Sequence, residues 1–349
     1  MELKSLLSNI APPDPRAARE AQRRWDALAK PLGSLGRLEE AVVRIAALTG
    51  DAEVRLDRRM LLVFCADNGV VTQGVSQCGS EVTAAVARAL GRGESTVCAM
   101  ARAARCRVQG VDMGIRDFPL CKGVLSCRIA NGTGDITQGP AMSRENCLSA
   151  IRAGAGLALV QEADILALGE MGIGNTTTAA AVASVLLALP PERLAGRGAG
   201  LSDEGLARKV AAIHRAIERN RPDGADPIDV LAKLGGLDIA AMCGAYLGAA
   251  LRRIPVLIDG MIGAAAALCA ARLCPTAAAA MLASHVSAEP ASGLLLEAMG
   301  LRPLIDAGLR LGEGSGAVAA LPLLDMALEV YRSGHGFDDL GIAAYVPQE

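Results

Sequence analysis

The sequence has few aromatic side chains, few histidines and almost no net charge. Only 2% of its 349 residues are aromatic, and three are histidines. Scarce aromatic rings argue against a surface that stacks the bases of single-stranded nucleic acid. A formal net charge of -2 gives no general attraction to nucleic acid or to an anionic membrane. We therefore expect neither as a partner.

The ten cysteines do not follow the spacing of a metal site. None forms a CxxC pair, and with so few histidines a zinc site is not expected. The first residues, "MELKSLLSNIAPPDPRAARE", lack the apolar core of a signal peptide. The longest uncharged stretch, residues 171–191, is interrupted by Gly, Asn, Thr and Pro, unlike a membrane span. These features predict a cytoplasmic protein with reduced thiols and no zinc site. We also expect no cofactor.

Hydrophobic residues, by contrast, make up 52% of the chain, and apolar segments alternate with helical ones. Expected strands lie at 60–67, 106–115, 163–175, 254–263 and within 277–287, and expected helices at 80–93 (with Ser80 as the cap), 176–189 and 264–273. Such alternation predicts an α/β fold, a parallel Rossmann-like sheet with helices on both faces.

Two helices before the first strand and one at the end of the chain do not follow this alternation. They are expected at 14–29, 37–49 and 316–333, with Gly50 closing the second. We therefore predict two domains. Residues 1–55 with about 317–349 form a small helical domain, and residues 56–316 form the large α/β catalytic domain.

Polar residues mark the predicted carboxyl ends of the strands. They are Asp67, Asp112, Glu170, Asp259 and Ser284. In an open parallel sheet, ligands bind just beyond these ends. The pattern predicts a ligand site at this edge.

Two glycine-rich stretches are candidates for a phosphate site. In "LGEMGIGNTTTAAA" (168–181) a strand runs into a turn and then a helix, whose first N–H groups favour an anion. The alternative is a tight connection capped by Asn175. Lys209 follows a second such stretch, "GRGAGLSDEG". It either reaches a phosphate or lies on a solvated helix face.

Two further motifs have competing interpretations. "ASHVSAEP" (283–290) gathers polar residues, but without a GxSxG elbow it favours a hydrogen-bonded structural His285 over a hydrolase. In "RLGEGSG" (310–316) the single acid Glu313 either caps the helix that follows or faces a planar ligand between its glycines.

Taken in order, six stretches resemble one family across nearly the whole chain. They are "KPLGSLGRLE", "CADNGV", "GTGDITQGPAMS", "GEMGIGNTTTAAA", "ASHVSAE" and "RLGEGSGA". The family is nicotinate-nucleotide–dimethylbenzimidazole phosphoribosyltransferase. The resemblance implies transfer of ribose 5-phosphate from nicotinate mononucleotide to 5,6-dimethylbenzimidazole. The products are alpha-ribazole 5'-phosphate and nicotinate, in cobalamin nucleotide-loop assembly. It also implies a homodimer that works without a metal.

The resemblance also assigns site residues. Glu313 corresponds to the catalytic base, which removes the N–H proton of the attacking benzimidazole. Glu170 lies near the donor, and Lys209 matches a lysine at the donor phosphate. The remaining implied substrate-binding residues are Gly172, Gly174, Asn175, Thr176, Asp259, Ser287 and Leu311.

The implied acceptor pocket departs from the family pattern. Here "GVSQCGSEVTAAV" has Cys78 followed by a glycine where relatives carry a proline, and Val86 where some carry a glutamine. A purine or a phenol therefore stays open as acceptor. A dinucleotide-dependent oxidoreductase fits poorly because the glycine fingerprint is incomplete. A non-catalytic subunit of a heterodimer is a further alternative, against which the retained Glu313 and Glu170 argue.

Overall fold

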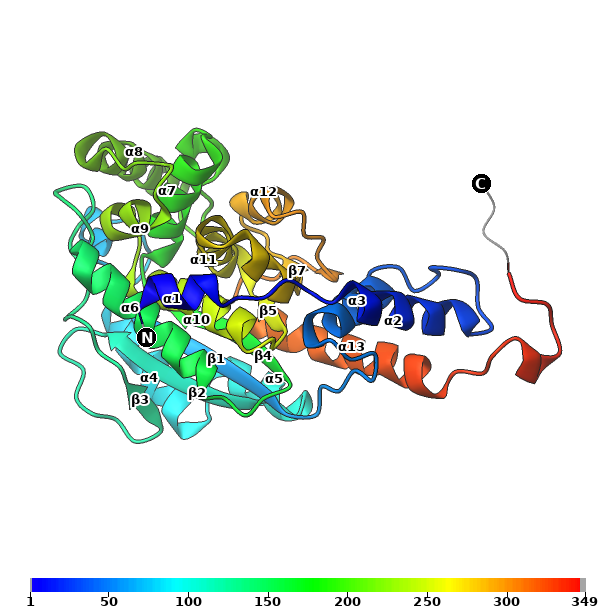
Figure 1. The fold of residues 1–349 in the computed structure, drawn as a ribbon. Coiled ribbons are helices and arrows are strands. Elements are labelled where there is room, and N and C mark those ends of the chain that lie inside the picture. The colour runs from blue at the N-terminus through cyan, green and yellow to red at the C-terminus, as the bar shows by residue number, and fades with distance from the viewer. Residues whose placement is uncertain (1, 346–349) are drawn as a thin grey trace.

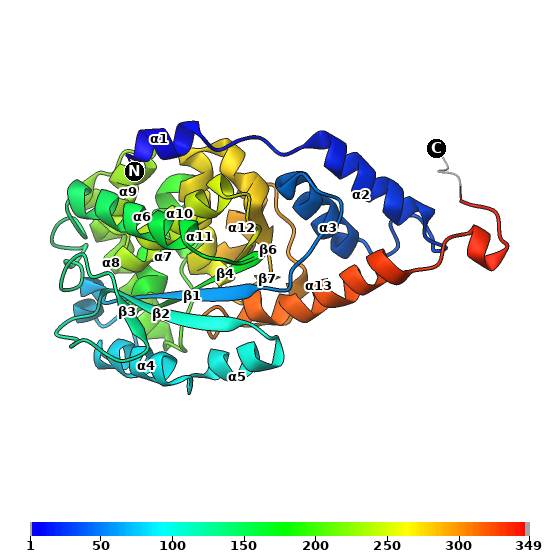
Figure 2. The same cartoon turned by 60° about the horizontal axis from the view of Figure 1, so that its bottom comes forward.

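The computed structural model describes residues 2–345, and a parallel six-stranded sheet lies at its centre (Figures 1 and 2). The strand order is β3-β2-β1-β4-β5-β6. The strands are β1 (Arg59–Ala66), β2 (Arg107–Gly114), β3 (Val124–Ser126), β4 (Ile165–Met171), β5 (Val256–Ile258) and β6 (Met281–Ala283). Two short strands, β7 (His285–Val286) and β8 (Ile305–Asp306), form a separate parallel pair.

The central strand β1 is mostly apolar, which makes the sheet easy to recognise in the sequence. It pairs with β2 on one side and β4 on the other. Its residues are almost all buried, as expected for a strand covered on both faces. The predicted α/β class is confirmed. The expected strand at 254–263 was too long, because α11 starts at Gly260.

Helices cover both faces of the sheet. Alternate strand side chains enter two different cores: Leu62, Phe64 and Leu166 pack with α6, α7, α10 and α11, whereas Leu61 and Val63 pack with α4, α5 and α13. Figure 2 shows these two layers above and below the strands. The helices are α1 (Leu3–Ser8), α2 (Pro15–Ala27), α3 (Arg37–Thr49), α4 (Glu81–Arg92), α5 (Thr96–Ala103), α6 (Arg144–Leu159), α7 (Asn175–Leu187), α8 (Asp203–Asn220), α9 (Pro227–Leu234), α10 (Leu237–Leu251), α11 (Gly260–Leu273), α12 (Ala291–Ala298) and α13 (Ser315–Ser333), with short 3-10 turns η1 (Gly69–Gln73), η2 (Pro191–Arg193), η3 (Pro275–Ala280) and η4 (Asp338–Leu340).

The three helices expected outside the alternation are α2, α3 and α13, which are confirmed and lie side by side (Figures 1 and 2). The Trp25 and Tyr331 rings, 5.0 Å apart, join α2 to α13. Gly50 ends α3 in the left-handed conformation, as expected. The short helix α1 instead packs against α10, with Leu6 in the core of the large sheet face. The two-domain division stays a prediction.

One helix start differs from the sequence expectation. Ser80 precedes α4, but its side chain makes no capping hydrogen bond and its backbone is already helical. Ser95, in contrast, has extended backbone and accepts a hydrogen bond from Cys98 N at the start of α5. A capping side chain needs this extended conformation to reach back to the first turn.

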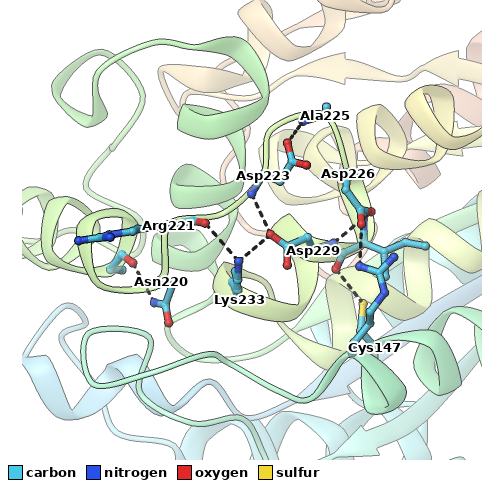
Figure 3. A network of polar contacts seen from close by, with 11 residues as sticks. Cys147, Asn220, Arg221, Asp223, Ala225, Asp226, Asp229 and Lys233 are labelled. Carbon is cyan, nitrogen blue, oxygen red and sulfur yellow. Dashed lines mark hydrogen bonds and ion pairs between the residues drawn. The ribbon is translucent and has the colours of Figure 1, made fainter.

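The segment between α8 and α9 is fastened by a network of paired charges (Figure 3). Lys233 Nζ lies 2.8 Å from Asp229 Oδ2 and donates to the Arg221 carbonyl at 3.1 Å. Asp229 Oδ2 also accepts from Asp223 N at 2.8 Å. Asp226 caps α9 and pairs with Arg144 at 2.7 Å. Across residues 2–345, no helix is long and apolar enough to cross a membrane.

Candidate active site

A pocket of about 270 Å³ opens at the carboxyl ends of β4 and β5. It is formed by the segments that follow β4, β5 and β7, including the starts of α7 and α11, by the loop before α13, by α4 and the segment before it, and by the segment before α8. Most predicted site residues line it: Val86, Glu170, Gly172, Gly174, Asn175, Thr176, Asp259, Ser287, Leu311 and Glu313. Lys209 lies directly behind the wall, and Cys78 lies outside the lining.

Glu313 is held in an unusual backbone conformation. It has φ 60°, between two glycines that also have positive φ, a conformation that non-glycine residues adopt rarely. Its N–H donates to the Glu170 carbonyl at 3.2 Å. This approach requires Gly169, because a Cβ there would lie 2.5 Å from the Glu313 carbonyl carbon. Such local strain often marks a functional position.

The Glu313 side chain does not cap α13. Its Oε2 accepts from Val97 N at 3.4 Å, at the start of α5. Asp259 takes the capping role instead, accepting from Gly314 N, Gly316 N and Ala317 N at 3.0, 2.8 and 3.2 Å. The capping interpretation of Glu313 is therefore wrong. Its carboxylate is buried, 7% exposed, at the pocket wall.

Asn175 connects two buried carboxyl groups. Its Nδ2 donates to Glu170 Oε2 and, at 2.9 Å, to Asp238 Oδ2. The alternative in which Asn175 caps α7 is thus wrong. Burial raises the pKa of Glu170 to about 8, with Asn175 opposing and neighbouring acids adding to the shift. Burial likewise raises the pKa of Asp259 to about 7 and that of Asp238 to about 6.

The start of α7 faces the pocket with no side-chain cap from the described part of the chain. Behind it, Lys209 Nζ donates to Thr176 Oγ1 and to the Gly196 carbonyl, both at 2.9 Å. Lys209 is fully buried, so its placement on a solvated face is wrong. Burial lowers its pKa to about 8, against the attraction of Glu289. A helix start with a lysine behind it is suited to a phosphate.

Other polar groups at the pocket lack partners among residues 2–345. Ser287 Oγ and Glu289 Oε2 are buried and unpaired, while Glu289 Oε1 accepts from Gly198 N at 2.9 Å. His285 Nδ1 lies 3.0 Å from Ser284 Oγ, which confirms a hydrogen-bonded histidine. Burial lowers its pKa and favours the neutral ring. Unpaired buried groups at a pocket are candidates for ligand contacts.

Two of the strand-end acids do not reach the pocket. Asp112 pairs with Arg128 at 2.9 Å, and Asp67 Oδ2 accepts from Arg116 N at 2.8 Å. Cys78 Sγ lies 3.7 Å from Ser76 Oγ, and Ser76, not Cys78, lines the pocket. Asp67 and Asp112 shape neighbouring loops instead.

Sequence reasoning missed several lining residues. They are Ser76, Met171, Ile173, Gly198, Ala199, Gly260, Met261, Ile262, His285, Glu289, Arg310 and Gly312. Some follow strands or sit in recognised motifs and could have been named from that position. Asp238, which touches Asn175 from the first turn of α10, had no such signal.

Comparison with known proteins agrees with this geometry. A family model described as "Phosphoribosyltransferase" matches residues 10–342. Curated proteins named nicotinate-nucleotide–dimethylbenzimidazole phosphoribosyltransferase are similar along their whole length. The one from Acetivibrio thermocellus is 45% identical over 94% of both chains, and the one from Ruminiclostridium cellulolyticum is 42% identical over 100% of both. The crystal structure of CobT from Thermus thermophilus matches with a TM-score of 0.90 at 40% identity, covering 95% of this chain and 100% of that one.

The fold is therefore that of a phosphoribosyltransferase. More specifically, the chain belongs to the nicotinate-nucleotide–dimethylbenzimidazole phosphoribosyltransferase family.

Proposed function

We propose that this enzyme transfers ribose 5-phosphate from nicotinate mononucleotide to 5,6-dimethylbenzimidazole. The products are alpha-ribazole 5'-phosphate and nicotinate, and the step belongs to cobalamin nucleotide-loop assembly. The observation that carries the proposal is the pair of glutamates, Glu313 and Glu170, held by one backbone hydrogen bond beside an uncapped helix start. Family membership supplies the substrates.

The donor phosphate binds at the start of α7. Asn175 and Thr176 of this helix start line the pocket, and the Ser287 hydroxyl, buried and without a partner among the described residues, lines the same pocket. Lys209 adds positive charge from behind Thr176. An incoming phosphate offsets the desolvation of this lysine, so donor binding raises the pKa of its ammonium. The phosphate and Lys209 therefore stabilise each other.

The acceptor base binds between Glu313 and the apolar side chains of Val86 and Leu311. One ring nitrogen attacks the anomeric carbon, the bond to nicotinate breaks, and nicotinate leaves with that bonding pair. Glu313 takes the proton from the other ring nitrogen, so the product ring is neutral. Val97 N–H holds one carboxylate oxygen and leaves the other for this proton.

Glu170 supports the donor side as a neutral acid. Because its pKa is raised to about 8, it keeps its proton at neutral pH. It can then donate a hydrogen bond to an oxygen of the bound donor. Two carboxyl groups with different environments thereby take opposite roles, as acid and as base.

A panel of bases tests the proposal. Purified enzyme with saturating nicotinate mononucleotide is given dimethylbenzimidazole, benzimidazole, adenine or a phenol, and kcat/KM is measured for each. We expect dimethylbenzimidazole to be used about tenfold better than benzimidazole, since two buried methyl groups each contribute about 0.8 kcal/mol. Preference for adenine or the phenol would keep the donor chemistry and replace the acceptor. No product with any base would overturn the transferase proposal.

We also propose a cytoplasmic homodimer, with a heterodimer as the alternative. All ten cysteines, which lie within the described residues, are free thiols, as in a reducing compartment. Light scattering on the purified protein checks the assembly. A mass of two chains supports the homodimer, and a monomer that becomes active only with a different subunit supports the alternative.

A further inference from the structure

A second buried carboxyl group lies behind Glu170. Asp238, on the first turn of α10, is 0% exposed. Its Oδ2 accepts from Asn175 Nδ2 at 2.9 Å, and the same nitrogen donates to Glu170 Oε2. An amide nitrogen has two hydrogens, so both are used. Asn175 therefore holds the two carboxyl groups in fixed relation.

The packing around Asp238 leaves it little freedom. A Cβ at Gly172 would lie 2.9 Å from Asp238 Oδ2, so the turn after β4 closes directly over this oxygen. Asp238 Oδ1 is buried without a partner in the described chain. Asn68, which accepts from Thr178 Oγ1 at 3.3 Å, lies beside it. The Asp238 side chain is therefore closely surrounded by polar groups behind the pocket lining.

Glu170 lines the same pocket as the exposed Arg310 and lies near ionisable groups on several elements. They are Asp238 from α10, Asp259 after β5, Glu313 before α13 and the Cys65 thiol of β1, with the uncharged His285 beside Asp259. The three acids disfavour a charge on Glu170. Asp238 stands in the first turn of α10, where the helix start favours a carboxylate, and backbone N–H groups lower its pKa against burial. Glu170 has only the Asn175 amide to oppose burial and the three acids that raise its pKa. This difference in hydrogen bonding favours Asp238 as the charged member and Glu170 as the protonated one.

We propose that Asp238 is a positioning residue for the transfer: through Asn175 it fixes the Glu170 carboxyl, and its charge keeps Glu170 a neutral hydrogen-bond donor toward the pocket. Asp238 itself lies behind the lining and does not touch the substrates. This inference rests on the proposed function for its kinetic consequence, whereas its effect on the Glu170 proton does not depend on which substrate is used.

The first test is the pH profile of Asp238→Asn. The amide has the same shape, can accept from Asn175 and can donate to Asn68, so the fold is retained. Wild-type kcat/KM should fall above about pH 8, where Glu170 loses its proton. In the variant, this alkaline limb should move to lower pH by on the order of one unit. Asp67→Asn is the matched control: this buried acid bonds Arg116 N rather than Asn175, and its limb should stay in place.

A second variant predicts the opposite sign. Asn175→Ala removes the N–H donor that favours the charged form of Glu170, so the alkaline limb should move to higher pH. A role of Asp238 in folding alone would lower activity at every pH and leave the alkaline limb of Asp238→Asn unmoved. That result would overturn the proposal.

The third readout needs no substrate. Infrared titration of protein with 13C-labelled glutamate follows the C=O stretch of the protonated carboxyl, and Glu170→Gln identifies the band. We expect the band to be present at neutral pH in the wild type. In Asp238→Asn the Glu170 carboxyl should lose its proton, and the band should disappear, at a lower pH than in the wild type. An unchanged band in Asp238→Asn would overturn the inference. Absence of transfer by the wild type would overturn the proposed function, while this titration would still decide the role of Asp238.

Discussion

The pocket floor and the α8–α9 segment use carboxylates in opposite ways. At the α8–α9 connection, Asp226 pairs with Arg144, and on α9 Asp229 pairs with Lys233 (Figure 3). At the pocket, Glu170 and Asp238 are buried and share only an amide. The first arrangement fastens a loop, whereas burial in the second raises the pKa of both acids. Burial without a cation favours the protonated form of an acid, which is the form that the role proposed for Glu170 requires.

The largest effect is expected at Glu313. Glu313→Gln removes the base while keeping its shape, so turnover should fall about 10²–10⁴-fold. The measurement is kcat with both substrates saturating. Glu297→Gln, an exposed acid on α12, is the control and should match the wild type. Near-normal turnover in Glu313→Gln would remove Glu313 from the chemistry.

Lys209 should act on the donor alone. Lys209→Met fills the same buried space without the charge, and a charge-assisted hydrogen bond contributes roughly 1.5–3 kcal/mol. The KM for nicotinate mononucleotide should therefore rise about 10–100-fold, with little change in the KM for the base. The exposed neighbour Arg208, changed to Met, is the control. Equal effects on both KM values would contradict a donor-phosphate role.

The buried Glu170 should also affect how the free energy of unfolding depends on pH. The raised pKa of Glu170, from 4.5 to about 8, means that the native state binds more protons than the unfolded state in this range. The free energy of unfolding should fall as the pH rises from about 5 to about 8, by up to about 1.4 kcal/mol per pH unit for this group. Urea denaturation of the wild type and Glu170→Gln checks this. The variant should show a shallower decline, and an identical slope would place the proton elsewhere.

The smallest effect is expected in the paired network. Lys233 and Asp229 are one helical turn apart and partly exposed, with side chains 30% and 23% accessible. Lys233→Met should lower the free energy of unfolding by less than about 1 kcal/mol and leave transfer unchanged. A double-mutant cycle with Asp229→Asn isolates the pair. A coupling of several kcal/mol would make this surface network as consequential as the pocket.

The sheet could be predicted because its signal is local. Strand β1 is a continuous apolar run that ends at an acid, and helices alternate with such runs. Glu170 and Asp259 were found by the same rule, since both stand where a strand ends. The rule also named Asp112, which an arginine neutralises. Which acid stays unpaired depends on tertiary packing.

The missed features are long-range. Asp238 looks like an ordinary acid in a helix first turn, and only the packing of α10 under the β4 turn brings it to Asn175, 63 residues away in sequence. The contact that orients Glu313 comes from the backbone N–H of Val97, which leaves no trace in side-chain identity. Ser76 lines the pocket and Cys78 does not, so the role of Cys78 in binding the base stays a prediction.

The contact between Gly169 and the Glu313 loop makes the spacing of the two glutamates independent of the apolar residues that line the pocket. The spacing of the two glutamates is set by main-chain atoms, a hydrogen bond from Glu313 N to the Glu170 carbonyl across a residue with no side chain. The apolar lining of the pocket comes partly from Val86 on α4, a different element. Under the proposed function, substitutions on α4 should change which base is accepted while the two glutamates keep their geometry. For an engineer seeking new lower-ligand bases, α4 is then the part to vary, and the Gly169 contact is the one to leave unchanged.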